Sequence, residues 1–466
     1  MPWMDDKAED YCGGLTMSLV GSLIKSTGQF ARNHIPGQIV IQITNQCNGL
    51  CPQCGMRRSK KFSRTSLCDD TIRRTLDGCA AKGVQAISFT GGEPFLMLDR
   101  LMDWINYAGR LNIPYIRTGT NGFLFCGSDR PGFIDRIKRL ADRLATTPLR
   151  NFWISLDSSL PDVHENMRGL PGVVAGIEKA LPIFHAAGIY PSANLGINRL
   201  VGGQKTKELH SKDFLKRESY LEEFYHTYMA ALDGFYRFVE NLGFSIVNTC
   251  YPMSISDNEQ KKGLAAVYAA TAVDDVVRFS CDEKAMLYKA LMDTIPFHRD
   301  RLRIFTPLSS VYRLYQSYRD KNRSKRAAGC RGGVDFFFID AAKGDTYPCG
   351  YRGKENLGKF WRLDLKTLPL DNQCHRCDWE CFRDPSEFFA PILELMHSPV
   401  KMLSKRTTDP IYRRLWLEDL KYYHHCDLFD GRKPGGRDRF PHYFHSAVKT
   451  ITTITPAYFE SVLRRL

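Results

Sequence analysis

Residues 47–54 read Cys-Asn-Gly-Leu-Cys-Pro-Gln-Cys and follow the apolar, β-branched run 39–44, Ile-Val-Ile-Gln-Ile-Thr. Three thiols on the loop that leaves a predicted strand suggest a metal site. Structural zinc takes four protein ligands, and iron–sulfur clusters are usually held by four cysteine thiolates. No fourth Cys or His follows within residues 55–64. The triplet therefore predicts a cluster with one iron open for chemistry, and a zinc knuckle or a set of buried thiols is the alternative.

A second motif lies about forty residues further along the chain. Residues 86–94, Ala-Ile-Ser-Phe-Thr-Gly-Gly-Glu-Pro, form a short apolar run that ends in two glycines, an acid and a proline. Glycine lets the backbone approach a ligand closely, and a carboxylate at this place can accept hydrogen bonds from an ammonium group. This motif is an ordinary turn when it stands alone, so its weight comes from its position after the cysteine triplet.

Apolar runs alternate with helical stretches from residue 38 to about residue 252. Such alternation favours parallel βαβ units, whose functional groups gather at the carboxyl ends of the strands. We expect strands over 39–44, 84–90, 115–119, 152–157, 190–197 and 244–250. We expect helices over 69–82, 98–111, 131–144, 172–187 and 219–242.

The spacing Cys-x3-Cys-x2-Cys after a first strand, followed by Gly-Gly-Glu after a second, resembles the radical S-adenosylmethionine (SAM) enzymes. The resemblance implies an α/β fold, a partial (β/α)6 TIM-like barrel. It implies that Cys47, Cys51 and Cys54 hold a [4Fe–4S] cluster whose open iron binds SAM. One electron from the cluster then cleaves SAM, and the resulting 5′-deoxyadenosyl radical takes a hydrogen atom from a substrate.

The same resemblance implies contacts to SAM at the ends of several strands. Gly91, Gly92 and Glu93 would hold its amino group. Further candidates are Asn121 in a Thr-Asn-Gly turn, Ser155 and Asp157 on the fourth strand, Arg168 in a His-x3-Arg-Gly segment, and Asn194 on the fifth strand. Arginine suits a carboxylate because its donors form a fork; a surface position is the alternative for Arg168.

A second cysteine group begins at Cys330, where an aromatic run, a turn and Cys349 predict a hairpin with a thiol at each end. Cys374, Cys377 and Cys381 follow. A zinc ribbon is one interpretation. The spacing also resembles the SPASM and twitch extensions, which carry auxiliary [4Fe–4S] clusters, although one thiol of the full SPASM pattern is missing. We therefore expect one auxiliary cluster on Cys330, Cys349 and two of the other three.

Composition is that of an ordinary globular protein, with 43% hydrophobic and 25% charged residues in 466. We see neither a membrane span nor a secretory signal, so fifteen cysteines indicate reduced thiols and metal in the cytoplasm. Five segments are predicted. They are an amphipathic N-terminal segment (1–37), a radical SAM core (38–257), a helical basic bridge (258–328), an auxiliary-cluster domain (329–390) and a C-terminal helical extension (391–466).

The resemblance is specific for the superfamily and weak for the substrate. We expect hydrogen abstraction that leads to oxidation, cross-linking or epimerisation, with flavodoxin or ferredoxin as the electron donor. Because only 46 residues precede Cys47, a small molecule or a lipid is the first expectation, and a ribosomal peptide is the alternative. The net charge of +14 and the amphipathic ends add peripheral membrane contact as a further alternative. An alternative of another class is a non-catalytic iron–sulfur or zinc scaffold that binds nucleic acid, which we do not expect.

Overall fold

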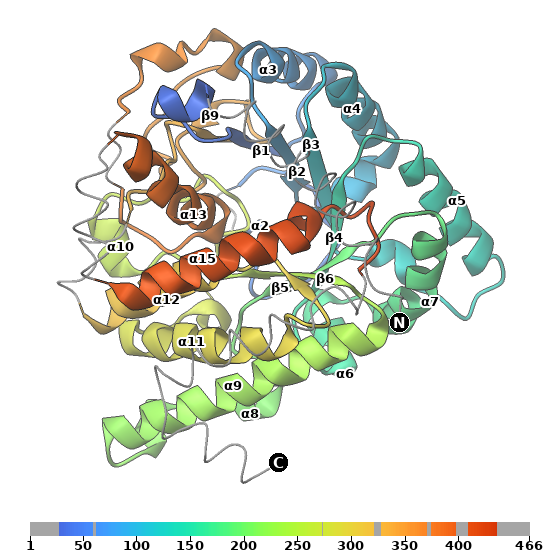
Figure 1. Cartoon of the computed structure of the whole chain (residues 1–466). Coiled ribbons are helices and arrows are strands. Elements are labelled where there is room, and N and C mark those ends of the chain that lie inside the picture. The colour runs from blue at the N-terminus through green and yellow to red at the C-terminus, as the bar shows by residue number, and fades with distance from the viewer. Residues whose placement is uncertain are drawn as a thin grey trace, which may run out of the picture.

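The computed structural model describes residues 28–58, 62–272, 274–320, 328–370, 374–397 and 409–435. Its centre is one twisted sheet whose strands run in the order β7-β6-β5-β4-β3-β2-β1-β8-β9 (Figure 1). All neighbouring strands are parallel except β8 and β9, which form the antiparallel hairpin. The strands are β1 (Gln38–Thr44), β2 (Ala86–Gly91), β3 (Tyr115–Thr120), β4 (Asn151–Leu156), β5 (Ser192–Gly196), β6 (Ile246–Cys250), β7 (Arg303–Ile304), β8 (Phe336–Ile339) and β9 (Thr346–Tyr347).

Helices connect consecutive strands and cover the outside of the sheet (Figure 1). The longer ones in the barrel are α3 (Asp69–Ala81), α4 (Leu98–Arg110), α5 (Phe133–Ala145), α6 (Pro161–Arg168), α7 (Val173–Ala186) and α9 (Arg217–Leu242). The later ones are α11 (Cys281–Thr294), α12 (Leu308–Arg319), α13 (Glu380–His397) and α15 (Pro410–His425), and the short ones are α2 (Gly55–Arg58), α8 (Gln204–Lys207) and α10 (Asp257–Lys261). All expected strands and helices of the barrel are present, with ends within two residues of the prediction.

The side chains of the strands alternate between two cores. On β1, Ile39, Ile41 and Ile43 are fully buried among the residues of the covering helices. Val40 points the other way, into a second cluster that contains Phe338 of β8 and Trp379. A strand whose successive residues face opposite sides must be apolar throughout when both sides are covered. This explains why the run before the cysteine triplet is almost continuously hydrophobic.

The hairpin expected after Cys330 is continuous with the barrel sheet. Strand β8 pairs in parallel with β1, with Gln38 opposite Phe336 and Ile41 opposite Ile339. At the other edge, the bridge expected to be helical also contains β7, which pairs with β6. The predicted domain limits stay predictions, but the cysteine-rich hairpin is packed directly against the strand that leads to the first thiols.

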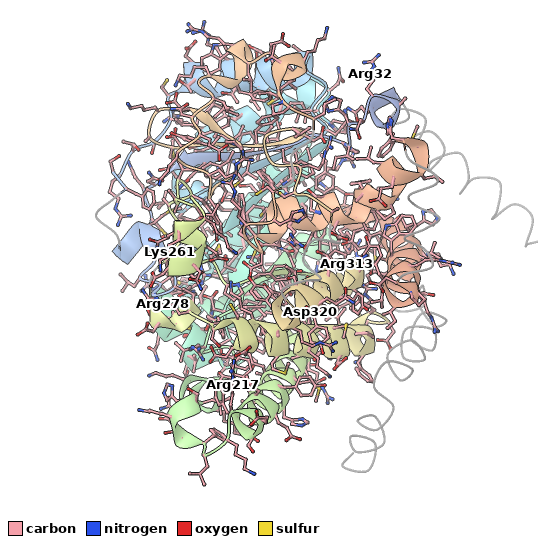
Figure 2. All side chains as sticks on the ribbon, turned by 90° about the vertical axis from the view of Figure 1, so that its left-hand side faces the viewer. Arg32, Arg217, Lys261, Arg278, Arg313 and Asp320 are labelled. Carbon is pink, nitrogen blue, oxygen red and sulfur yellow. The ribbon has the colours of Figure 1, made fainter. Side chains whose placement is uncertain are left out.

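The ends of the chain lie mostly outside the described residues. This holds for most of the amphipathic segment expected at 1–37 and for the part of the extension after residue 435. Within the described part, α15 packs along α12, and Arg313 of α12 contacts Asp409 at 2.7 Å (Figures 1 and 2). Figure 2 also places Arg32, which precedes β1, and Arg217, which begins α9, at opposite ends of the molecule. Among the described helices, none is long and apolar enough to cross a bilayer.

Candidate functional site

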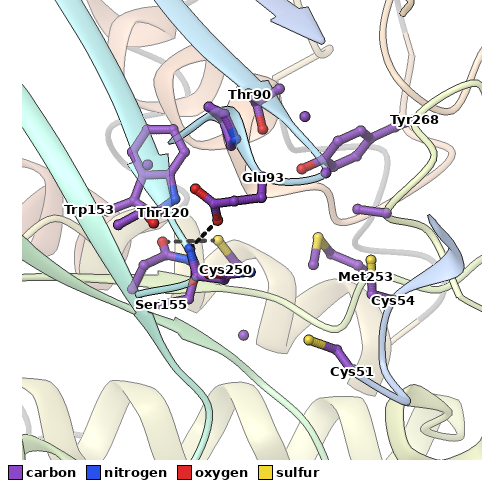
Figure 3. Close-up of a pocket in the computed structure, with 18 of the residues that line it drawn as sticks. Cys51, Cys54, Thr90, Glu93, Thr120, Trp153, Ser155, Cys250, Met253 and Tyr268 are labelled. Carbon is purple, nitrogen blue, oxygen red and sulfur yellow. Dashed lines mark hydrogen bonds between the residues drawn. The ribbon is translucent and has the colours of Figure 1, made fainter. Parts of the chain in front are cut away.

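A cavity of about 180 Å³ opens at the carboxyl ends of the central strands. Every residue of the cluster and SAM sites expected in the barrel lines this cavity. These residues are Cys47, Cys51, Cys54, Gly91, Gly92, Glu93, Asn121, Ser155, Asp157, Arg168 and Asn194. Figure 3 labels four of them, Cys51, Cys54, Glu93 and Ser155. The parallel sheet explains the convergence, because the ends of parallel strands meet at one edge.

The loop of the first thiols is held by close backbone contacts. The amide of Gly49 donates to Cys47 Sγ at 3.3 Å, and Asn121 Nδ2 lies 3.8 Å from the same sulfur and donates to Asn48 Oδ1 at 2.8 Å. Burial raises the pKa of Cys51 to about 11 and that of Cys54 to about 12. These thiols must lose their protons to bind a metal. Because they are buried from water, the positive charge of the iron would have to stabilise the resulting thiolates.

The two glycines of the second motif stand where a side chain would clash with the backbone. A Cβ at Gly92 would lie 2.0 Å from the carbonyl oxygen of Gln46, and one at Gly91 would lie 2.6 Å from that of Thr44. The amide of Gly92 donates to the carbonyl of Thr44 at 2.7 Å, and the amide of Glu93 donates to that of Gln46 at 2.8 Å. The motif therefore clamps the strand end of β2 onto the start of the cysteine loop.

Glu93 has partners within the protein. Its carboxylate accepts the backbone amides of Phe95 at 2.9 Å and Asn121 at 2.5 Å, and the residue has no solvent exposure. Burial raises its pKa to about 7. The side chain thus ties the second strand end to the third, in addition to facing the cavity where the amino group of SAM is expected.

Asp157 and Arg168 form a buried fork. Arg168 donates through Nε to Asp157 Oδ2 at 2.7 Å and through Nη2 to Oδ1 at 3.0 Å. The guanidinium also faces the thiols of Cys47 and Cys51, which together with Asp157 raise its pKa. Arg168 is therefore not on the surface, and its fork already has a carboxylate partner. Its expected contact with the carboxylate of SAM stays a prediction.

The second cysteine group divides between two cavities. Cys330, Cys349, Cys374 and Cys377 line one small enclosed space together with Arg352. Cys381, the fifth candidate ligand, lines the SAM cavity instead. Cys374 and Cys377 therefore lie beside the hairpin thiols, and their role as cluster ligands stays a prediction. Trp379, between Cys377 and Cys381 in sequence, lines both cavities.

The four-thiol space has the charges that an anionic cluster needs. The guanidinium groups of Arg352 and Arg383 are close enough to interact with its thiols. Arg383 Nε and Trp379 Nε1 are buried donors without a partner in the structure. Four thiols, the buried cation of Arg383 and the half-buried cation of Arg352 fit an iron–sulfur cluster. In the described part of the chain, no three His, Cys, Asp or Glu side chains converge closely enough to share a single metal ion. A four-iron cluster is wider than one ion, and its thiolates bind different irons.

Residues 41–210 match the family model described as the Radical SAM superfamily. The chain carries a radical SAM domain. This confirms the superfamily and barrel fold expected from the two motifs, and with them an open-site [4Fe–4S] cluster and SAM as the cofactors of the domain.

Named relatives match parts of the radical SAM protein. The probable GTP 3′,8-cyclase of Thermococcus kodakarensis is 27% identical over 34% of this chain and 48% of its own length. The PqqA peptide cyclase of Gluconobacter oxydans is 26% identical over 35% of this chain and 42% of its own length. The match therefore spans about half the length of these relatives or less. A solved structure titled anSMEcpe with bound AdoMet is 15% identical, covers 75% of this chain and 80% of its own, and has a TM-score of 0.45.

Several residues that line the radical SAM cavity were not predicted from the sequence. Cys250 ends β6, Arg117 lies on β3, and Glu380 begins α13. Cys250 shows no ligand spacing, but its place at the carboxyl end of a predicted parallel strand was a usable signal. Glu380 could not have been found, because it reaches the cavity only through the long-range packing of α13.

Proposed function

We propose that this protein is a radical SAM enzyme that cleaves SAM reductively and abstracts a hydrogen atom from a substrate C–H bond. The observation that supports it most is the single cavity in which Cys47, Cys51 and Cys54 meet the Gly-Gly-Glu clamp and the Asp157–Arg168 fork. Bound to these thiols, a cluster with one open iron would supply the electron that cleaves SAM. A non-catalytic scaffold does not require the thiols, the clamp and the fork to line one cavity.

The chain's own residues would position the reactants and exclude water. Glu93 and Asp157 are almost fully buried, so SAM would sit among fixed dipoles instead of mobile solvent. Arg168 carries positive charge toward the thiols and would offset the negative charge of a thiolate-ligated cluster. The clamp at Gly92 leaves no space for a side chain beside the cysteine loop.

The test is anaerobic reconstitution of the full chain with iron and sulfide, followed by incubation with dithionite and SAM. We expect 5′-deoxyadenosine and methionine in equal amounts, and about eight irons per chain if both thiol groups hold a [4Fe–4S] cluster. Protein that binds no iron, or that binds iron and leaves SAM intact, contradicts the proposal and favours the scaffold.

We propose a second [4Fe–4S] cluster on Cys330, Cys349, Cys374 and Cys377. Replacement of Cys377 by alanine is expected to lower the iron content from about eight to about four per chain. Replacement of Cys381 is the matched control, because Cys381 follows Cys377 by only four residues in the sequence and faces the other cavity. Equal iron loss in the two variants would show that Cys381 is also a ligand. Iron counting and the low-temperature EPR of the reduced proteins check this.

For the substrate, we propose a polypeptide segment. The sequence favours a small molecule or a lipid. The likeness of the matched third of the chain to PqqA peptide cyclase supports the peptide alternative better. Cells would be grown on deuterated medium and extracted. The extract would be divided into a peptide fraction and a small-molecule fraction, and each fraction would be offered to the enzyme. Deuterium in 5′-deoxyadenosine from the peptide fraction supports the proposal, whereas deuterium from the small-molecule fraction alone contradicts it. The electron would come from a flavodoxin or ferredoxin, which dithionite replaces in the test.

A further inference from the structure

Two thiols in the SAM cavity belong to neither cluster site. Cys250 reaches it from the end of β6 and Cys381 from the first turn of α13, about 130 residues later. Burial raises the pKa of Cys250 most, and the nearby carboxyl of Glu380 and thiol of Cys381 raise it further. Long-range packing has therefore placed a pair of thiols beside the expected SAM site, with Glu380 between them in space (Cys250 is labelled in Figure 3).

Glu380 serves both thiols. Cys381 Sγ donates to Glu380 Oε1 at 3.6 Å, and Oε2 accepts the backbone amide of Tyr251 at 3.3 Å. The carboxyl of Glu380 also shares a hydrogen bond with the thiol of Cys250. These bonds fix a carboxyl group within proton-transfer reach of two sulfurs.

The second thiol is oriented by the strands. Cys250 Sγ donates to Asn194 Oδ1 at 3.4 Å, and Asn248 Nδ2 donates to the same oxygen at 2.7 Å. Asn194 is one of the residues that the sequence predicts beside SAM. Cys250 is therefore tied through one amide to a residue that is expected to contact SAM.

The environment keeps both thiols protonated. Burial raises the pKa of both thiols well above the usual value, and burial raises the pKa of Glu380 to about 7. A thiol that keeps its proton is a poor nucleophile. It is a good source of hydrogen atoms, because an S–H bond is weaker than most C–H bonds.

We propose that Cys250 and Cys381 form a hydrogen-donating thiol pair that returns a hydrogen atom to the carbon radical, with Glu380 as the proton source that restores the thiol. This rests on the proposed function. The substrate radical gains H• from S–H, so a C–H bond forms, the S–H bond breaks and a thiyl radical remains. The thiyl radical takes one electron from a low-potential iron–sulfur or flavin protein and one proton from Glu380, which water reprotonates.

The number of hydrogen atoms that the substrate loses and regains indicates the class of reaction. The substrate loses one hydrogen atom and regains one, so its oxidation state does not change. A hydrogen atom that is returned to the face opposite to the one from which it was taken inverts the carbon. The pair therefore points to epimerisation among the outcomes that the sequence leaves open, and not to oxidation or cross-linking.

The test needs no substrate. Without one, the 5′-deoxyadenosyl radical itself would take a hydrogen atom from the nearest donor. The reconstituted full chain is incubated with dithionite and SAM in D₂O, free of small thiols, so that the cysteines carry S–D. We expect most of the 5′-deoxyadenosine to contain one solvent deuterium. We expect this fraction, measured per molecule formed, to fall at least tenfold in a Cys250→Ala/Cys381→Ala double variant.

Cys126→Ala is the control, because Cys126 lies outside both cavities, and it should keep the deuterium fraction of the unmodified protein. Iron content is the second readout and should not change in the double variant. Wild-type 5′-deoxyadenosine without deuterium, or a label that survives in the double variant, overturns the thiol pair. Iron loss in the double variant also overturns it, since the thiols would then be ligands. If no 5′-deoxyadenosine forms at all, the proposed function fails instead.

Discussion

Replacement of Cys51 by alanine is expected to reduce the formation of 5′-deoxyadenosine to the level of cluster-free protein. Cys51 is the middle one of the three expected ligands and is only 7% exposed. Cys47 and Cys54 are the other two thiols of the loop 47–54 that line the cavity, so the variant would keep two ligands for a cluster expected to take three from the protein. The assay is anaerobic incubation with dithionite and SAM, with chromatography of the products.

The control for Cys51→Ala is again Cys126→Ala, which removes a thiol of similar size from outside the cavity. We expect it to retain iron and SAM cleavage. The Cys51 variant should also lose about four irons, because the second cluster has its own ligands. SAM cleavage at the wild-type rate in Cys51→Ala would show that the catalytic cluster is held elsewhere.

The barrel was predictable because each local signal agrees with the global fold. The short β-branched run 39–44 favours a strand buried on both faces, and most of the helical stretches between the strands carry one apolar face. Parallel strands bring their carboxyl ends together, so residues far apart in sequence, such as Glu93 and Arg168, could be assigned to one site. Agreement between local and global preferences is what makes a sequence readable in this way.

The division of the second cysteine group was not predictable from spacing. Cys377 and Cys381 are four residues apart in the sequence, and both are candidate ligands by spacing. Because α13 begins between them, at Glu380, Cys377 lines the four-thiol cavity and Cys381 lines the SAM cavity. The same holds for Cys250, whose neighbour Glu380 comes from the other end of the chain. The pairing of β8 with β1 likewise depends on contacts between residues about 300 positions apart. Such contacts are set by tertiary packing, on which local propensity carries no information.

The docking of α15 is another feature that the sequence did not reveal. Asp419, which has no solvent exposure, accepts a hydrogen bond from Arg299 Nη2 at 2.8 Å. It also accepts the amides of Leu308 at 3.1 Å and Ser309 at 2.8 Å, which begin α12. One carboxylate therefore neutralises a buried cation and satisfies free amides at the start of a helix, where negative charge is favourable. Nothing in the composition of residues 410–425 distinguishes this aspartate from its exposed neighbours.

Replacement of Asp419 by alanine is expected to lower the free energy of unfolding by about 3–5 kcal/mol, because it leaves the Arg299 cation and the helix-start amides buried without a partner. Asp419→Asn should cost less, since its amide oxygen can still accept one of these bonds. Asp275→Ala is the matched surface control. It breaks an ion pair with Arg278 that is 3.5 Å long and largely exposed, and it should leave stability unchanged. Urea denaturation of the cluster-loaded proteins, followed by circular dichroism, measures all three. Equal stability of Asp419→Ala and Asp275→Ala would mean that α15 contributes nothing to the fold of the barrel.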